Sequence, residues 1–157
     1  MKPLTKLYLE RADNELTQAE TLFKISSDEQ LQKQFALPKR YTFYSGTINH
    51  AYYAIFNSAK SILIEHGIKT RPPNIHKQTY EAFEKHIVKK GRLDPNLLQI
   101  YKEMILKAEE LLGIFKDEKQ KRGKFTYKIL PQANQEPAKQ SIENAQKFYK
   151  HINNAVK

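Results

Sequence analysis

The sequence predicts an all-α fold, an up-and-down bundle of four to five long helices with one or two short extra helices. Apolar residues recur at steps of three and four along most of the chain, and no segment alternates as a half-buried strand would. Prolines and glycines fall mainly between the periodic segments. At 157 residues and 39% hydrophobic, the chain is long enough for one core, so we treat 1–157 as a single helical domain.

The first long helix is expected at about 4–25. Its apolar positions follow helical spacing: Leu9, Ala12, Leu16, Ala19, Leu22 and Phe23. A short helix should follow, with Ser27 as its N-cap and Gln30 three residues later, and Pro38 should end it.

A second long helix is expected at about 41–66, with a wide apolar face. The residues of that face are Tyr44, Ile48, Ala51, Tyr52, Ile55, Phe56, Ala59, Ile62 and Leu63. Gly67 stands where a C-cap glycine is typical, and the two prolines of 71–74 predict a loop.

Three further segments complete the predicted bundle. A third helix at about 75–89 should bury Tyr80, Phe83 and Ile87. The fourth should begin with Asp94 as N-cap and Pro95 in the first helical position. The periodic pattern breaks between 121 and 136, and a last helix is expected at about 137–156.

The positive charge is concentrated near the end of the sequence. The net charge is +10, and residues 119–157 contribute +7 of it through nine Lys and Arg against two Asp and Glu. This asymmetry indicates either an anionic partner or a lysine-rich surface that keeps the protein soluble.

Several classes of protein are excluded or disfavoured. The chain has no cysteine, which excludes a disulfide framework and a thiolate nucleophile. Its first residues lack the apolar run of a signal peptide, and no stretch approaches the roughly 20 apolar residues of a membrane span, so we expect a cytoplasmic protein without membrane contact. Phosphate-loop, dinucleotide and HExxH motifs are absent, and the histidines lack ligand spacing, so we expect no cofactor and no metal.

Two segments are candidates for function. In 49–60, small residues alternate with aromatic ones, and Asn49, His50, Asn57 and Lys60 interrupt the apolar face. The alternative interpretation is a core helix with polar edges. In 117–128, five basic residues surround Phe125 and Tyr127, a composition that suits phosphate contacts and base stacking; an unliganded basic loop is the alternative.

These segments resemble a HEPN domain. The similarity lies in the run from His50 to Phe56, in His76 with Phe83, and in Arg122 with Tyr127. It covers about residues 40–156, and more narrowly the sequence is similar to the small prokaryotic HEPN proteins often encoded beside a minimal nucleotidyltransferase. The resemblance implies a helical bundle, usually a homodimer, with a cleft at the dimer interface.

Many HEPN proteins are metal-independent ribonucleases, and many are toxins neutralised by a nucleotidyltransferase. Their motif is an Arg followed four to six residues later by His. In this sequence Arg122 is followed at that spacing by Tyr127, and His50 stands where relatives often carry Arg. A tyrosine with an ordinary pKa near ~10 is a poor proton carrier at neutral pH, so the motif is degenerate and leaves enzymatic activity open.

The resemblance therefore leads to two expectations of function. The first is a protein that binds nucleotide or RNA beside a nucleotidyltransferase partner in a toxin–antitoxin-type module. Its contacts would come from Lys121, Arg122, Lys124, Tyr127, Asn49, His50 and Lys60, with Tyr127 stacking, donating a hydrogen bond or accepting a modification from the partner. The second is an endoribonuclease that combines Arg122 with Tyr127, or with a histidine from elsewhere such as His50 or His76.

Overall fold

A computed structural model describes residues 1–39, 41–112 and 134–157, with side chains described to Glu110 in the second range. The helices within these ranges are α1 (Pro3–Ser27), α2 (Glu29–Gln34), α3 (Tyr44–Glu65), α4 (Ile75–Phe83), α5 (Asn96–Leu112) and α7 (Gln135–Ala155). α4 continues directly into a π-helical turn, Glu84–Val88. No strand forms in these ranges, so the predicted all-α class is confirmed.

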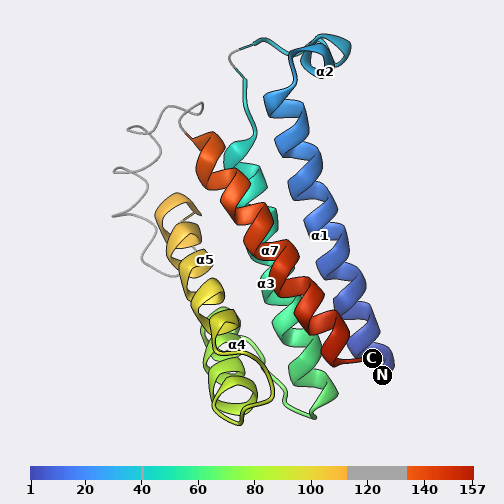
Figure 1. Ribbon diagram of the computed structural model, residues 1–157, viewed down its shortest axis with the longest axis vertical. Coiled ribbons are helices and arrows are strands. Elements are labelled where there is room, and N and C mark those ends of the chain that lie inside the picture. Colours follow the sequence, from blue (N-terminus) through green and yellow to red (C-terminus); the bar gives the residue numbers. More distant parts are fainter. Residues whose placement is uncertain (40, 113–133) are drawn as a thin grey trace.

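The long helices run alternately up and down, and both ends of the chain lie at the same end of the bundle (Figure 1). Helix α1 is antiparallel to α3, since Lys2 contacts Ile64 at one end and the Thr47 hydroxyl donates to the carbonyl of Ala19 at the other. Similarly, Lys107 of α5 reaches Gln140 near the start of α7. The predicted up-and-down arrangement is therefore present.

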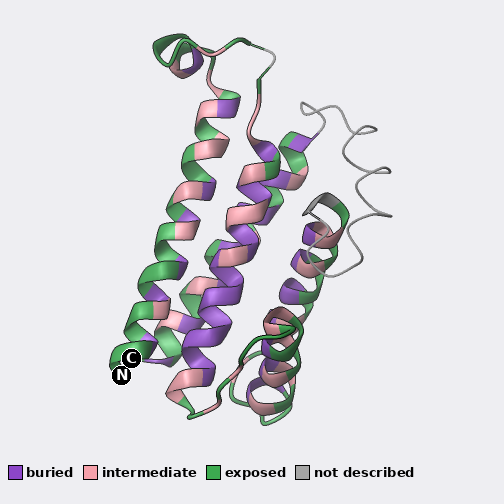
Figure 2. Ribbon diagram, turned by 180° about the vertical axis from the view of Figure 1, so that it is seen from behind, coloured by how far each residue is buried: buried purple, intermediate pink, exposed green. Residues whose placement is uncertain are grey.

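Helix α3 is the central element. It packs against α1, α4, α5 and α7, and fifteen of its 22 residues are buried, which explains its nearly continuous burial in Figure 2. The small residues Ala51, Ala54 and Ser58 are fully buried and let neighbouring helices approach closely. The Ser58 hydroxyl donates to the carbonyl of Ala54, so its burial leaves no polar atom unpaired.

Aromatic side chains join α4, α5 and α7 on the other side of α3. The rings of Phe83, Tyr101 and Phe148 pack with centroids between 5.4 and 5.8 Å apart. All three side chains are fully buried, so this cluster fixes the α4–α5 unit against the rest of the core.

Most predicted helix ends are confirmed, but both ends of α2 differ from the prediction: α2 ends at Gln34 with Phe35 as its C-cap, before Pro38. Gly67 has a left-handed φ of 77° and ends α3, as its position predicted. Asp94 caps the start of α5, its carboxylate accepting from the backbone N–H of Asn96 at 2.8 Å. The prediction of Ser27 as the N-cap of α2 was wrong: Ser27 is the last residue of α1, and the Asp28 carboxylate accepts from Gln30 and Leu31.

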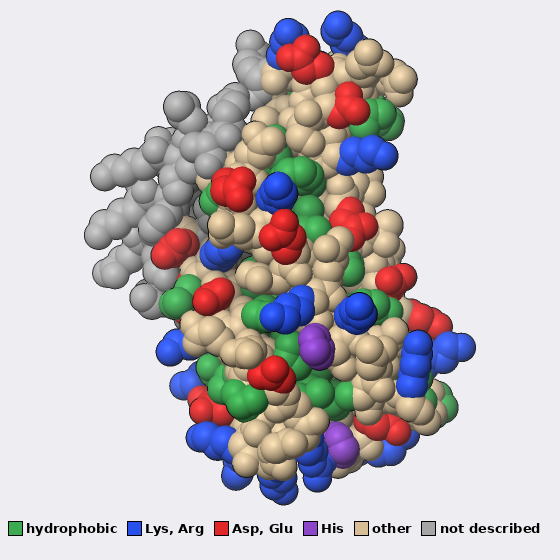
Figure 3. All heavy atoms as spheres, viewed as in Figure 1, with side chains coloured by type: hydrophobic (Ala, Val, Ile, Leu, Met, Phe, Trp, Pro, Cys, Tyr) green, Lys and Arg blue, Asp and Glu red, His purple; other side chains and the backbone are tan. Residues whose placement is uncertain are grey.

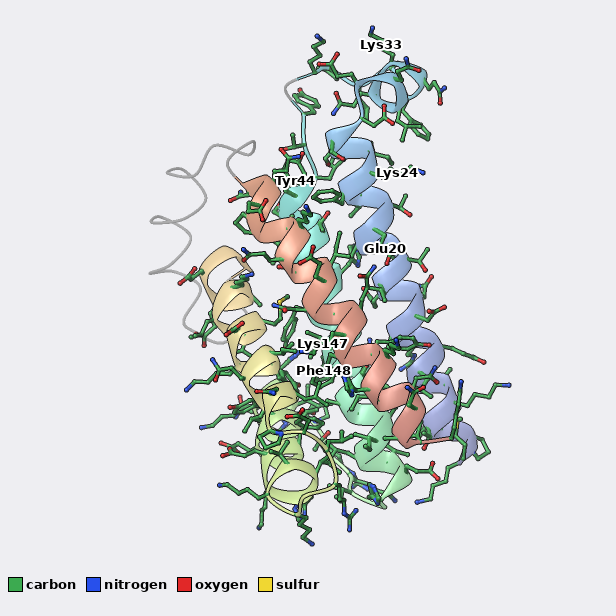
Figure 4. The ribbon with its side chains drawn as sticks, viewed as in Figure 1. Glu20, Lys24, Lys33, Tyr44, Lys147 and Phe148 are labelled. Carbon is green, nitrogen blue, oxygen red and sulfur yellow. The ribbon has the colours of Figure 1, made fainter. Side chains whose placement is uncertain are left out.

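Charged side chains cover the surface of the bundle, and Lys and Arg gather around its lower end in Figure 3, where both ends of the chain lie. Tyr44 lies toward the opposite end and Phe148 at mid-height in Figure 4. At the end of the bundle where Tyr44 lies, its hydroxyl donates to the carbonyl of Ser26 at 3.3 Å. This hydrogen bond joins the start of α3 to the end of α1.

Candidate functional site

Polar side chains of α1 and α3 lie along one seam between the two helices. In α3 they follow steps of three and four, which places them on one helix face, and those of α1 follow the same spacing. We call this set the polar seam; its members are Tyr8, Arg11 and Glu15 of α1 and His50, Tyr53, Asn57 and Lys60 of α3. Because the helices are antiparallel, Glu15 meets His50 and Tyr8 meets Lys60.

A carboxylate–histidine pair occupies one end of the polar seam. Nδ1 of His50 lies 2.6 Å from Oε2 of Glu15, and each side chain is about one-quarter exposed. A carboxylate oxygen only accepts, so Nδ1 carries the proton and donates it. Nε2 makes no hydrogen bond within the described ranges, and in the neutral imidazole it is the atom that can take up a proton. This arrangement is typical of an oriented general base.

The Lys60 ammonium marks the other end of the polar seam. Lys60 is only 6% exposed, and its Nζ lies 5.0 Å from the centre of the Tyr8 ring. Its ammonium group donates to the carbonyl of Thr70 at 3.5 Å, and no carboxylate of the described residues forms an ion pair with it. The guanidinium of Arg11 lies 5.1 Å from the same ring. Tyr8 is therefore an aromatic contact for two cations.

A second histidine lies deeper, beside the aromatic residues of α3. Nδ1 of His76 is hydrogen-bonded to the Tyr52 hydroxyl at 2.8 Å, and its ring lies 4.4 Å from that of Phe56. Burial lowers the pKa of His76, and the positive charge of Lys60 lowers it further. Burial also raises the pKa of Tyr52 far above its ordinary value, so the phenol stays protonated. His76 is thus held neutral in the aromatic layer.

The comparison with protein families identifies this architecture. The model of the HEPN domain matches residues 35–155, which is most of the chain. This chain belongs to the HEPN domain family. Membership supports a nucleotide- or RNA-related function for the domain. No curated protein matches the chain. None of the described helices of this HEPN domain has the length and apolar character needed to cross a membrane.

The structure describes three of the seven residues singled out in the sequence. His50 and Lys60 lie at opposite ends of the polar seam, and half-buried Asn49 precedes His50. Ten residues of helix separate His50 from Lys60, about 15 Å along the axis, so one small ligand does not contact both. Lys121, Arg122, Lys124 and Tyr127 lie outside the described residues.

Sequence reasoning missed the contribution of the first helix to this HEPN domain. Glu15 and Tyr8 were not among the candidates, although they complete the surroundings of His50 and Lys60. The available signal was the polar spacing of Tyr8, Arg11 and Glu15, which matches that of His50, Tyr53, Asn57 and Lys60. Within the described ranges, no group of His, Asp and Glu is arranged to hold a metal ion.

Proposed function

We propose that this HEPN protein binds nucleotide or RNA as a homodimer and acts with a minimal nucleotidyltransferase partner in a toxin–antitoxin-type module. The observation that carries the proposal is the HEPN family match over residues 35–155. Charge supports it, since +7 of the net charge lies in 119–157. In this proposal Arg122, Lys121 and Lys124 contact phosphate groups, and Tyr127 stacks on a base or donates a hydrogen bond.

Binding of a mixed-sequence RNA by fluorescence anisotropy at two salt concentrations tests the proposal. We expect the affinity to fall steeply with salt, because phosphate contacts release counterions. Arg122→Ala should weaken binding and reduce the salt dependence. Lys139→Ala is the matched control, since it removes one charge from the same part of the sequence at an exposed position of α7. Binding that is indifferent to salt, or equally affected by both variants, would exclude the assignment to the Arg122 segment.

The partner is tested separately. If the adjacent gene encodes a minimal nucleotidyltransferase, that protein and this chain are co-expressed. We expect them to elute as one stable complex on size-exclusion chromatography. Mass spectrometry of the co-expressed chain should show whether Tyr127 carries a nucleotidyl group, with Tyr127→Phe as the control. An adjacent gene of another kind, together with an unmodified Tyr127, would count against the module.

A metal-independent endoribonuclease is the second candidate, and the Glu15–His50 pair favours it. With Nδ1 held by the carboxylate, Nε2 of His50 is suited to accept the proton of a ribose 2′-hydroxyl, while Arg122 would stabilise the charge that develops on phosphate. His76 is less suited, because Nδ1 is engaged with Tyr52 and the ring is held among aromatic side chains.

Cleavage of RNA in the presence of a chelator distinguishes the two candidates. The ribonuclease requires activity that Arg122→Ala and His50→Gln abolish and that His151→Gln retains, His151 being an exposed histidine of α7. Absence of cleavage by the unmodified protein, together with salt-sensitive RNA binding, supports the binding function alone.

A further inference from the structure

A cavity of about 700 Å³ opens where the start of α1, the last turns of α3 and the segment between α3 and α4 meet. Its volume lies within the range of small-molecule sites in proteins. Four of the residues that line it are basic, namely Lys2, Lys60, Lys69 and Arg71, and no carboxylate is among the lining residues. This end of the molecule is also where Lys and Arg gather in Figure 3. The cavity is therefore electropositive.

Of the four basic residues that line the cavity, Lys60 is the one whose charge is buried. Its side chain is 94% buried, and its ammonium group lies 5.0 Å from the Tyr8 ring and 3.5 Å from the Thr70 carbonyl, with no carboxylate paired to it in the described ranges. Removing an ammonium group from water is costly unless an opposite charge or good hydrogen bonds replace the solvent. An anion bound in the cavity would supply both.

The segment that carries Lys69 and Arg71 is anchored in place. The hydroxyls of Thr70 and Thr79 are hydrogen-bonded at 3.0 Å, and the backbone N–H of Arg71 donates to Oε1 of Gln78 at 3.3 Å. Neither Lys69 nor Arg71 forms an ion pair with a carboxylate in the described ranges. Two exposed cations are thus held beside the buried one and are available to a ligand.

The remaining charges at the cavity are already engaged. Nζ of Lys2 donates to the carbonyls of Ile64 and Glu65 at 3.0 and 2.6 Å, so two of its three N–H groups are used at the end of α3 while its positive charge remains at the cavity. The carboxylate of Glu65, the residue after Ile64, accepts from the backbone N–H of Lys2 at 2.9 Å, a bond that lowers the pKa of Glu65. The Glu65 carboxylate forms no ion pair with Lys60, Lys69 or Arg71 in the described ranges; its ion pair is with the N-terminal ammonium group.

The cavity also has an apolar wall. Pro3, Leu4 and Ile64 line it, and Leu4 is 49% exposed beside the cations. A ligand that fits both parts has a compact, strongly charged group and an apolar body. A terminal phosphate is dianionic near neutral pH and matches three cations that line one cavity, one of them a guanidinium that can bind two oxygens at once. A phosphodiester within a nucleic-acid strand fits less well. It carries one charge, and the strand would have to continue in both directions from a phosphate bound at the buried Lys60.

We propose that this cavity is a binding site for a small phosphomonoester of mononucleotide size, with its phosphate against Lys60, Lys69 and Arg71 and its body against Pro3, Leu4 and Ile64. The site goes beyond the function proposed above, because it uses none of Lys121, Arg122, Lys124 and Tyr127. It is also separate from the Glu15–His50 pair, which lies about 15 Å away along α3.

Calorimetric titration of the full chain with AMP, adenosine and inorganic phosphate tests the site. AMP should bind, and adenosine should bind about tenfold more weakly or not at all, because the phosphate makes the charge-assisted contacts. Lys60→Met keeps the length and packing of the side chain, and Arg71→Gln changes an exposed residue; each should raise the Kd for AMP about tenfold. Lys102→Met, an exposed charge on α5, is the control and should bind as the unmodified chain does.

Four outcomes would overturn the proposal. They are no binding of AMP, equal binding of AMP and adenosine, unchanged affinity in both Lys60→Met and Arg71→Gln, and loss of AMP binding in Arg122→Ala. The last outcome separates this site from the proposed function, since Arg122→Ala should weaken RNA binding and leave AMP binding intact. Arg71→Gln keeps the test decisive if Lys60→Met fails to fold.

Discussion

Two buried tyrosines of the core differ in a way that matters for stability. The hydroxyl of Tyr52 is hydrogen-bonded to Nδ1 of His76 at 2.8 Å, whereas the hydroxyl of Tyr101 has no hydrogen-bond partner in the described part of the chain. Burial raises the pKa of both groups, so both remain protonated. A paired buried hydroxyl stabilises the fold, and an unpaired one carries a desolvation cost without compensation.

Replacing each tyrosine by phenylalanine should therefore change the free energy of unfolding differently. Tyr52→Phe removes the partner of a half-buried imidazole nitrogen and should lower the free energy of unfolding by about 1 kcal/mol. Tyr101→Phe removes only the unpaired oxygen and should leave that free energy unchanged or raise it. Urea denaturation followed by circular dichroism measures both. A loss of stability in Tyr101→Phe as large as that in Tyr52→Phe would show that the Tyr101 hydroxyl has a partner.

His76 should make the stability of the protein depend on pH. Its pKa is lowered in the folded state by burial and by Lys60, so the unfolded chain, with an ordinary value near ~6.5, binds the proton more readily. The free energy of unfolding should thus be greatest above about pH 7 and fall as the pH drops through 6.5 toward the folded pKa. His76→Gln should flatten this fall, leaving the contribution of His66, whose pKa is also lowered by burial. The free energy of unfolding is measured against pH for the unmodified chain and for His76→Gln. An identical pH dependence in the two proteins would show that His76 does not cause the fall.

Helix ends show how far the sequence determines the elements. Two predicted helix ends are correct: Asp94 with Pro95 predicted where α5 begins, and Gly67 predicted where α3 ends. These signals are local, because caps act through neighbouring residues only. Local sequence signals were not enough to predict that Asp28 is the N-cap of α2. Ser27 and Asp28 are both good capping residues, and the choice depends on the last turn of α1, where the Ser27 hydroxyl donates to the carbonyl of Phe23.

The candidate site was harder to predict than the elements. The polar positions of α3 were visible in the sequence, but the pairing of His50 with Glu15 and of Lys60 with Tyr8 depends on how α1 and α3 are aligned. That alignment is set by contacts between residues far apart in sequence, such as Lys2 with Ile64 and Thr47 with Ala19. No pattern within either helix specifies it.

Gly67 offers a test at the scale of one element. Its φ of 77° is left-handed, and a Cβ added there would meet nothing within 4 Å, so the cost of Gly67→Ala is conformational alone. We expect a loss of about 1 kcal/mol in the free energy of unfolding. Gly67→Asn should lose less, because asparagine tolerates this conformation better. Thermal unfolding of the unmodified chain, Gly67→Ala and Gly67→Asn measures their order of stability. Equal stability of Gly67→Ala and the unmodified chain would show that the end of α3 can rearrange.

At the scale of the whole molecule, the HEPN match begins at residue 35, yet the bundle depends on a helix that precedes it. Helix α1 packs along α3 and α7. It contributes the buried side chains Leu9, Ala12, Leu16 and Ala19. Without α1, the face of α3 that carries Thr47, His50 and Lys60 would lose the helix that it contacts, and Glu15 and Tyr8 would be missing from the polar seam. The family region alone is therefore an incomplete core.

A fragment of residues 35–157 should accordingly fail to fold as the full chain does. Its apolar surface would be exposed, so we expect reduced helical signal, binding of a hydrophobic dye and no cooperative thermal transition. Adding a peptide of residues 1–34 should restore part of the helical signal and the transition, because the contacts of α1 with α3 and α7 are noncovalent. A peptide with Leu16→Asp is the control and should restore less, since residue 16 is buried in the bundle. Cooperative unfolding of the fragment at the temperature of the full chain would show instead that α1 is an addition to a core that is complete without it.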